Sequence, residues 1–173
     1  MLQVVKAPNP SLRVKTKPVK KINQALLRTL KEMIKLTKTF NDPEGVGLAS
    51  TQVGLEERFF VAKNRQKFIS VINPKILSTG KSVKKYFEGC LSTPNIWGEV
   101  KRYKNIKISY LDERGKLIKI PLTGILAWIF QHEIDHLDGV LFQDRVLQQK
   151  GKFYKFSGKD KTGTDIFEEI TLP

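Results

Sequence analysis

The sequence predicts an α+β fold in which antiparallel strands surround a central helix, with an N-terminal helix before them and a β-hairpin at the C-terminus. Two observations support this prediction. Short β-rich runs fill the middle of the chain, whereas apolar residues at helical spacing are confined to one segment before those runs and one after them. No stretch of the 173 residues has the composition of a linker, so we expect one domain over residues 1–173.

The first part of the chain predicts a lead-in, a helix and a loop. Residues 9–21 contain two prolines and five basic residues, which is typical of an extended, solvated segment. Apolar residues then recur at mostly helical spacing over residues 22–40, which predicts an amphipathic helix that ends at the Asn-Asp-Pro of 41–43. Residues 44–54 carry three glycines, so we expect a loop whose backbone bends or lies close to another group.

The middle of the chain predicts a series of strands. Apolar and β-branched residues gather in short runs that are separated by turn residues. The Asp-Glu-Arg-Gly at 112–115 separates two such runs, 104–111 and 116–120, and this arrangement predicts a hairpin. The other strands are expected at residues 58–62, 68–73, 76–77 and 83–87.

The last third of the chain predicts a helix followed by a second hairpin. Helical spacing returns over residues 122–137, with Pro121 near the expected first turn and Gly139 as the expected stop. The runs 153–156 and 165–172 flank a glycine-containing stretch, which predicts the C-terminal β-hairpin.

Composition limits the class of protein. Lys and Arg number 31 against 17 Asp and Glu, so the formal net charge is +14. This charge favours contact with nucleic acid, a ribosome or a membrane surface. The alternative is that it only keeps the protein in solution. The single cysteine excludes a disulfide framework. The longest uncharged apolar stretch, residues 120–131, is too short to span a bilayer. Since no apolar leader is visible, we expect a reduced, cytoplasmic setting without membrane association.

The two histidines of the sequence predict a metal site. His132 and His136 lie four residues apart in the expected central helix, in a His-Glu-x-x-His pattern. Residues at i and i+4 share one helix face, so both imidazoles can bind one ion, and Glu133 beside them can handle protons on a bound water. The alternative, two surface histidines, fits less well because this segment is otherwise apolar.

A metal ion needs a third protein ligand. The extended zinc-protease pattern would place a histidine six residues after His136, but that position is Phe142. A carboxylate or Cys90 remains, and a thiolate binds such metals with high affinity, although a lone buried cysteine is equally suited to fill a core. Cys90 lies at the end of a strand pattern, between Gly89 and a Ser-Thr-Pro turn signal, and that place favours a ligand.

Three segments, in this order and separation, resemble the motifs of one family, the peptide deformylases. The Gly-Val-Gly-Leu-Ala-Ser-Thr-Gln at 45–52 resembles the first motif of the family. The Glu-Gly-Cys-Leu-Ser at 88–92 resembles the second, and the Gln-His-Glu-Ile-Asp-His at 131–136 resembles the third. The resemblance covers about residues 2–145, which is most of the chain.

The resemblance implies a metallohydrolase that removes the formyl group from the N-terminal formyl-methionine of new polypeptides and releases formate. Its metal ligands would be Cys90, His132 and His136, holding one divalent ion, with Fe²⁺ expected as the native metal and Zn²⁺ or Ni²⁺ as substitutes. The ion would lower the pKa of a bound water. Glu133 would take the water proton and deliver it to the departing amine.

The resemblance also implies how the oxyanion and the substrate are held. The Gln52 side chain and the backbone N–H of Leu91 would donate to the developing oxyanion, and the Gln52 amide can do so without a net charge. The peptide would lie along the glycine-rich motif like an added strand. Substrate binding is expected from Val46, Gly47, Glu88, Gly89, Ile125, Trp128 and Ile129.

Some positions support or depart from the family pattern. Glu88 would pair with Arg102 and hold the cysteine loop rigid. Trp128 stands where the family often has a smaller or basic residue, and Lys101 stands where proline is common. Residues 146–173 form an extension of unassigned role. Their sequence predicts strand rather than the long helix of some family members.

Two other functions remain as alternatives. One is a metallopeptidase that cuts internal bonds with a carboxylate third ligand such as Glu168 or Glu169. The other is a nucleic-acid-binding module with a structural metal, although such sites usually have four ligands. For the deformylase interpretation, the partners are formyl-Met nascent peptides, and we expect a monomer. The basic segments 13–21 and 150–161 would then contact ribosomal RNA.

Overall fold

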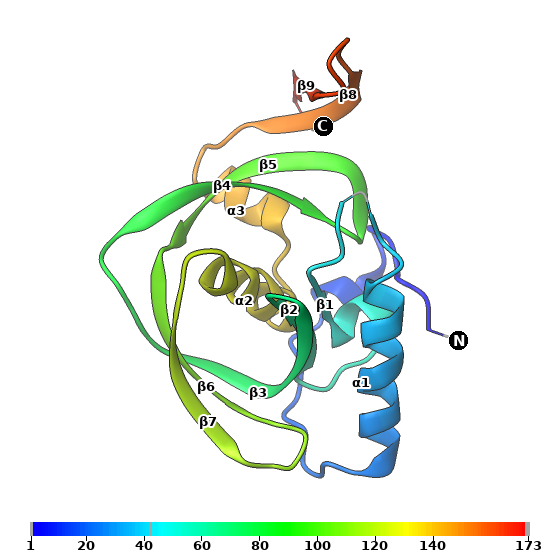
Figure 1. Cartoon of the computed structure of the whole chain (residues 1–173), viewed down its shortest axis with the longest axis vertical. Helices are drawn as coiled ribbons and strands as arrows, with labels where there is room; N and C mark the ends of the chain where they lie inside the picture. The colour runs from blue at the N-terminus through cyan, green and yellow to red at the C-terminus, as the bar shows by residue number, and fades with distance from the viewer. Residues whose placement is uncertain (1, 42, 172–173) are drawn as a thin grey trace.

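Two antiparallel sheets surround one helix, with a second helix along one side of them (Figure 1). The computed structural model describes residues 2–41 and 43–171. Within them the helices are α1 (Gln24–Thr37), α2 (Gly124–Leu137) and α3 (Phe142–Gln148), with 3-10 turns at Pro10–Arg13 and Ser50–Val53. None of these helices is long and apolar enough to cross a membrane.

Each sheet has a simple antiparallel order. The first runs β1-β2-β3-β6-β7 and the second runs β4-β5-β8-β9. The first sheet consists of β1 (Gly47–Ala49), β2 (Phe59–Asn64), β3 (Lys67–Thr79), β6 (Asn105–Leu111) and β7 (Leu117–Thr123). The second consists of β4 (Val83–Cys90), β5 (Thr93–Tyr103), β8 (Phe153–Lys159) and β9 (Asp165–Ile170). The expected α+β class and the central helix are thus confirmed.

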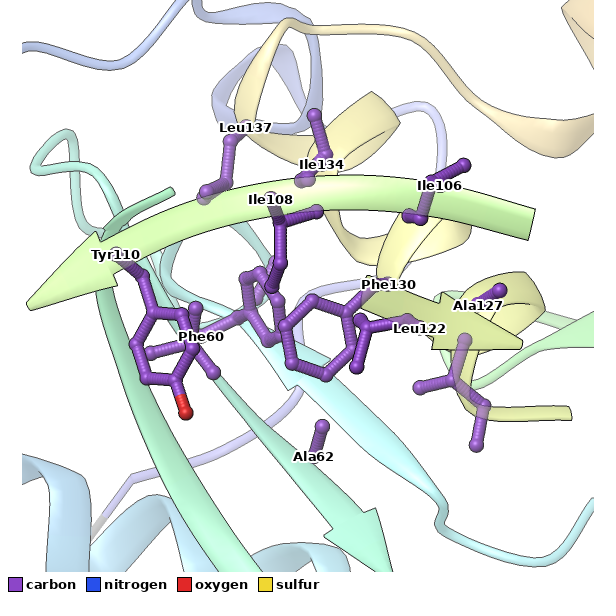
Figure 2. Packing of buried hydrophobic residues seen from close by; sticks show 13 residues of the cluster. Phe60, Ala62, Ile106, Ile108, Tyr110, Leu122, Ala127, Phe130, Ile134 and Leu137 are labelled. Carbon is purple, nitrogen blue, oxygen red and sulfur yellow. The ribbon is translucent and has the colours of Figure 1, made fainter. Parts of the chain in front are cut away.

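The first sheet is buried on both faces around β2. Alternate side chains of a strand point to opposite faces of the sheet. The Phe60 side chain therefore packs on the face covered by α2, and the Val61 side chain packs on the face covered by α1. On the α2 side, the Phe60 and Phe130 rings meet edge to face at 5.0 Å, and Figure 2 shows this pair among the buried residues of the cluster. On the α1 side, Leu30 and Met33 are fully buried. This packing fixes α2 against the sheet.

The N-terminal helix forms as its apolar spacing predicts, but over a shorter range. Asn23 caps α1, because its side chain accepts a hydrogen bond of 2.9 Å from the Leu26 N–H. The helix ends at Thr37 rather than at residue 40. Asp42, expected in the helix stop, lies outside the described residues. The lead-in also contains a 3-10 turn that buries Leu12.

The predicted start of the central helix is wrong. Pro121 lies inside β7, opposite Lys107, and α2 begins at Gly124. β7 is the edge strand of its sheet, where a residue without an N–H costs no ladder hydrogen bond. The predicted glycine-rich loop is also partly wrong, because Gly47–Ala49 pairs with β2 as strand β1.

Three further elements differ from the sequence prediction. The two expected strands over 68–77 are one strand, β3, whose pairing shifts where Asn73 has a φ of 50°. β5 was not expected, because its sequence mixes proline, glycine and charged residues and becomes a strand through pairing with β4. α3 was also missed, since it is short and is held by burial of Phe142 and Val146.

The C-terminal hairpin is confirmed as β8 and β9, which pair along their length. Leu172, the expected last residue of this hairpin, lies outside the described residues. β8 pairs with β5, so the extension adds two strands to the second sheet. That residues 1–173 act as one domain stays a prediction.

Candidate metal centre

Cys90, His132 and His136 lie together in the structure. Cys90 comes from the end of β4 and the two histidines from α2, and their ligand atoms all lie within 4.8 Å of one another. The Cys90 Sγ is 3.2 Å from the His136 Nε2, and all three residues are buried. The β4–β5 pairing shifts between Gly89 and Cys90, and irregularities of this kind re-aim a side chain.

These donors fit a divalent metal ion. Burial alone would raise the pKa of the Cys90 thiol, but the charges and hydrogen bonds of His136 and His132 lower it well below its ordinary value. The thiolate is the form that binds metal. Within the described residues, His136 Nδ1 is buried without a hydrogen-bond partner, while Nε2 of the same ring faces the Cys90 Sγ. Three protein ligands of this kind leave a position free for water or substrate.

Glu88 orients the first histidine of the pair. His132 Nδ1 donates to the Glu88 Oε2 at 2.9 Å, which leaves Nε2 of that ring for a metal. Arg102 donates to both oxygens of Glu88, at 2.8 and 2.9 Å, as the resemblance predicts. Burial raises the pKa of Glu88, but the hydrogen bond and charge of Arg102, aided by His132, lower it to about 2. The carboxylate is therefore charged.

The hydrogen-bond network around Glu88 includes more residues than the sequence predicts. Trp128 donates from its indole Nε1 to the Glu88 Oε1 at 2.8 Å. Behind Glu88, Asp135 accepts hydrogen bonds from Arg102 and from Arg145, the latter at 2.6 and 3.0 Å. Sequence reasoning assigned no role to Asp135 or Arg145, although Asp135 lies inside the histidine motif. These contacts join β5 and α3 to α2 through Asp135.

Glu133 is buried beside the ligand set. Burial raises its pKa to about 7, and its Oε2 has no hydrogen-bond partner within the described structure. The backbone of β1 passes directly over this side chain. A Cβ atom at Gly47 would therefore overlap the Glu133 carboxylate. Glycine at position 47 is thus needed for close approach. A carboxyl group with such a pKa can both accept and release a proton near neutral pH.

Gln52 is held with its amide nitrogen facing the cysteine. Its Oε1 accepts a hydrogen bond of 2.8 Å from the Ala49 N–H, and this contact fixes the orientation of the amide. The Nε2 then lies 3.4 Å from the Cys90 Sγ and 3.2 Å from the Ser92 Oγ. Leu91, the other expected oxyanion donor, follows Cys90 and is also buried.

A cavity of about 330 Å³ opens beside the ligand set. Its wall includes Cys90, His132, Glu133 and Gln52, so the reactive groups face this space. Of the expected substrate-binding residues, six line the cavity together: Val46, Gly47, Gly89, Ile125, Trp128 and Ile129.

The expected role of Glu88 in substrate binding requires correction. Glu88 does not line the cavity but lies behind its wall, where its side chain is 0% exposed and its oxygens contact Arg102, Trp128 and His132. Sequence reasoning also missed two aromatic residues of the wall, Phe87 and Trp97. The position of Phe87 directly before the cysteine motif was the available signal.

A carboxylate third ligand finds no support. Glu168 and Glu169 lie in β9, and Glu169 accepts from Lys152 at 2.7 Å. Among the described residues, the group that could hold a metal ion consists of a cysteine and two histidines.

A buried Cys-His-His set with an acidic residue beside it and a cavity in front defines a metal-dependent hydrolase. The sequence model of the family described as Polypeptide deformylase matches residues 1–152. A peptide deformylase of Thermotoga neapolitana is 44% identical over 142 residues, which are 82% of this chain and 85% of that protein. The chain belongs to the polypeptide deformylase family.

Solved structures agree with this assignment. The crystal structure of peptide deformylase from Thermotoga maritima is 41% identical, with a TM-score of 0.79 over 84% of this chain and 97% of that one. A Met-Ala-Ser-bound peptide deformylase of Acinetobacter baumannii is 30% identical, with a TM-score of 0.76 over 84% and 98% of the two chains. The protein is a metallohydrolase that removes the N-terminal formyl group from nascent polypeptides.

Replacing Trp128 by Phe should weaken metal binding without unfolding the site. The ring remains to stack on Tyr86, which lies 5.1 Å away, but the hydrogen bond to Glu88 is lost. We expect a loss of affinity of roughly three- to tenfold, below the 10–100-fold typical of direct partners of a ligand, because Arg102 still holds Glu88. The metal affinity is measured by following the transfer of the ion to a chromogenic chelator.

The matched control is Tyr86→Phe, which removes a polar group from the same stacked pair without touching Glu88. Equal metal affinity in the two variants would contradict a role for the indole N–H.

Proposed function

We propose that the chain hydrolyses the formyl amide of formyl-methionine peptides with Glu133 as the general base and acid. The observation that supports this is the Glu133 Oε2, which has no hydrogen-bond partner among the described residues and is buried beside the Cys-His-His donors at the cavity wall. When bound, a divalent ion lowers the pKa of water and so supplies a hydroxide nucleophile near neutral pH. Glu133 takes up the proton of the attacking water and passes it to the amine as the amide bond breaks.

Gln52 and Leu91 serve the developing oxyanion in this proposal. The Gln52 amide is fixed by the Ala49 N–H, so its Nε2 donor is positioned before the reaction begins. The backbone N–H of Leu91 is the second donor. Preorganised donors of this kind stabilise charge in the transition state without the cost of reorienting solvent.

The methionine side chain occupies the apolar part of the cavity in this proposal. Ile125, Trp128 and Ile129 of α2 provide an apolar wall beside the reactive groups. Val46, Gly47 and Gly89 border the space where the peptide backbone lies, and the two glycines permit its close approach.

Replacing Glu133 by Gln tests the proton-transfer role, since the shape is kept and the proton acceptor is lost. We expect kcat for formate release from formyl-Met-Ala-Ser to fall by roughly 10²- to 10⁴-fold, while the metal content stays that of the parent protein. Glu169→Gln is the control, because this carboxylate lies on the exposed surface of β9. Full activity in the Glu133 variant would refute the mechanism.

We propose ferrous iron as the native metal. Support comes from the resemblance, and the donor set itself accepts several divalent ions, whose affinity rises from iron toward nickel and copper. Protein purified without air should therefore contain iron and deformylate formyl-Met-Ala, and exposure to air with zinc present should exchange the ion and change the rate. Elemental analysis paired with the assay checks this. Zinc in the anaerobic protein at full activity would contradict it.

We also propose that the basic segments 13–21 and 150–161 dock the enzyme on ribosomal RNA, where it acts as a cytoplasmic monomer on emerging chains. Several lysines of these segments are already paired, such as Lys17 with Glu56 and Lys152 with Glu169. The contact would therefore depend on exposed lysines that form no ion pair within the described structure: Lys15, Lys20, Lys21, Lys150, Lys155 and Lys161.

Ribosome binding should then weaken steeply with salt, because each phosphate contact releases counterions. Exchanging Lys20 and Lys21 for Glu should reduce the affinity in sedimentation assays and flatten the salt dependence. The same exchange at Lys116 and Lys119, on the hairpin of the first sheet, should leave both unchanged. Affinity that is insensitive to salt would contradict the proposal.

A further inference from the structure

The β8–β9 hairpin lies beyond the part of the chain that matches the family. The family match ends at residue 152, and β8 begins at Phe153. The hairpin joins the second sheet through a short ladder, in which Trp97 pairs with Tyr154 and Gly98 with Phe153. In Figure 1 it lies outermost, above β5, and Phe153 at the start of β8 packs in the buried cluster with Val100, Phe142 and Val146. The hairpin is thus attached to the fold through β5 and through the buried Phe153.

Ring contacts between the hairpin and the second sheet add to this attachment. Phe167 of β9 contacts Phe87 at 4.9 Å and Trp97 at 5.4 Å between ring centroids, edge to face in both cases. Tyr154 of β8 contacts Phe87 at 5.2 Å. Phe87 and Trp97 are themselves stacked, with centroids 5.5 Å apart and ring planes 7° from parallel. Edge-to-face contacts of this kind hold a stacked pair in one orientation.

The same stacked pair forms part of the active-site wall. Phe87 and Trp97 both line the cavity that contains Cys90 and Glu133. Trp97 also covers Gly89, where an added Cβ would lie 2.9 Å from the indole ring, so it reaches to within one residue of the thiolate. Phe87 is still 39% exposed with the hairpin in place, and of the rings that contact it, Phe167 and Tyr154 belong to the hairpin.

We propose that the hairpin is a positioning element for substrate binding: Phe167 holds the Phe87–Trp97 wall in the orientation that receives the formylated peptide. This inference rests on the proposed substrate position in the cavity. Without Phe167, both rings gain rotamer freedom that peptide binding must then remove, and the apolar wall opens toward water. Phe167 is not among the described residues that line the cavity, so we expect it to affect binding rather than the chemical step.

The test is Phe167→Ala in the full-length chain, with Ile166→Ala as the matched control. Ile166 is the adjacent residue on β9, is exposed, and makes none of these ring contacts. We expect Phe167→Ala to raise KM for formyl-Met-Ala-Ser roughly three- to tenfold, which is the size expected for the loss of one or two aromatic contacts. The kcat, the metal content and the melting temperature should stay close to those of the parent protein.

Two further measurements separate positioning from a structural defect. Phe167→Leu keeps most of the apolar volume and should recover most of the loss in KM. The dissociation constant of the unformylated peptide Met-Ala-Ser, measured by titration calorimetry, should rise with KM in Phe167→Ala. This measurement needs no turnover, so it tests the effect of the hairpin on peptide binding even if the role of Glu133 is refuted.

Three outcomes would overturn the inference. These are equal KM and peptide affinity in Phe167→Ala and Ile166→Ala, a fall in kcat with unchanged KM, or a parallel loss of metal and melting temperature that Phe167→Leu does not recover.

Discussion

The buried carboxylate of Glu88 is the constraint on which the site depends. A charge with no exposure to water is stable only when its oxygens are fully hydrogen-bonded and a cation lies beside it. Arg102 supplies the cation from β5, His132 and Trp128 supply donors from α2, and Glu88 itself stands on β4. One charge thus ties the second sheet to the central helix, and it fixes the His132 ring that faces the ligand set.

The central helix serves the core and the site at once, through different faces. Phe130, Ile134 and Leu137 pack in the cluster against the first sheet. His132 and His136, one turn apart, face the end of β4 instead. Because the helix is buried by both sheets, its orientation is set by many apolar contacts and the ligands need no flexible loop to reach Cys90. Rigid placement of this kind is what metal chemistry requires.

Local signals were sufficient for much of this fold, and long-range pairing explains the rest. The periodicity of α1 and the turn residues of the two hairpins act between neighbours in the chain, so each is visible in a short window of sequence. β5 carries no such signal, since only its pairing with β4 makes it a strand. Pro121 misled the prediction of the α2 start, because whether a strand lies at the edge of a sheet is decided by topology.

The sequence by itself determined the chemistry. A cysteine, two histidines at helical spacing and a glutamate between them are residue types whose spacing predicts a metal site with an acidic group beside it. Tertiary structure alone decided what surrounds that chemistry. It placed Glu88 behind the cavity rather than in its wall, and it brought Phe167 of β9 onto Phe87 and Trp97. The reason is physical: ligand identity depends on residue type and local spacing, whereas burial and ring contacts depend on segments that meet only after the chain has folded.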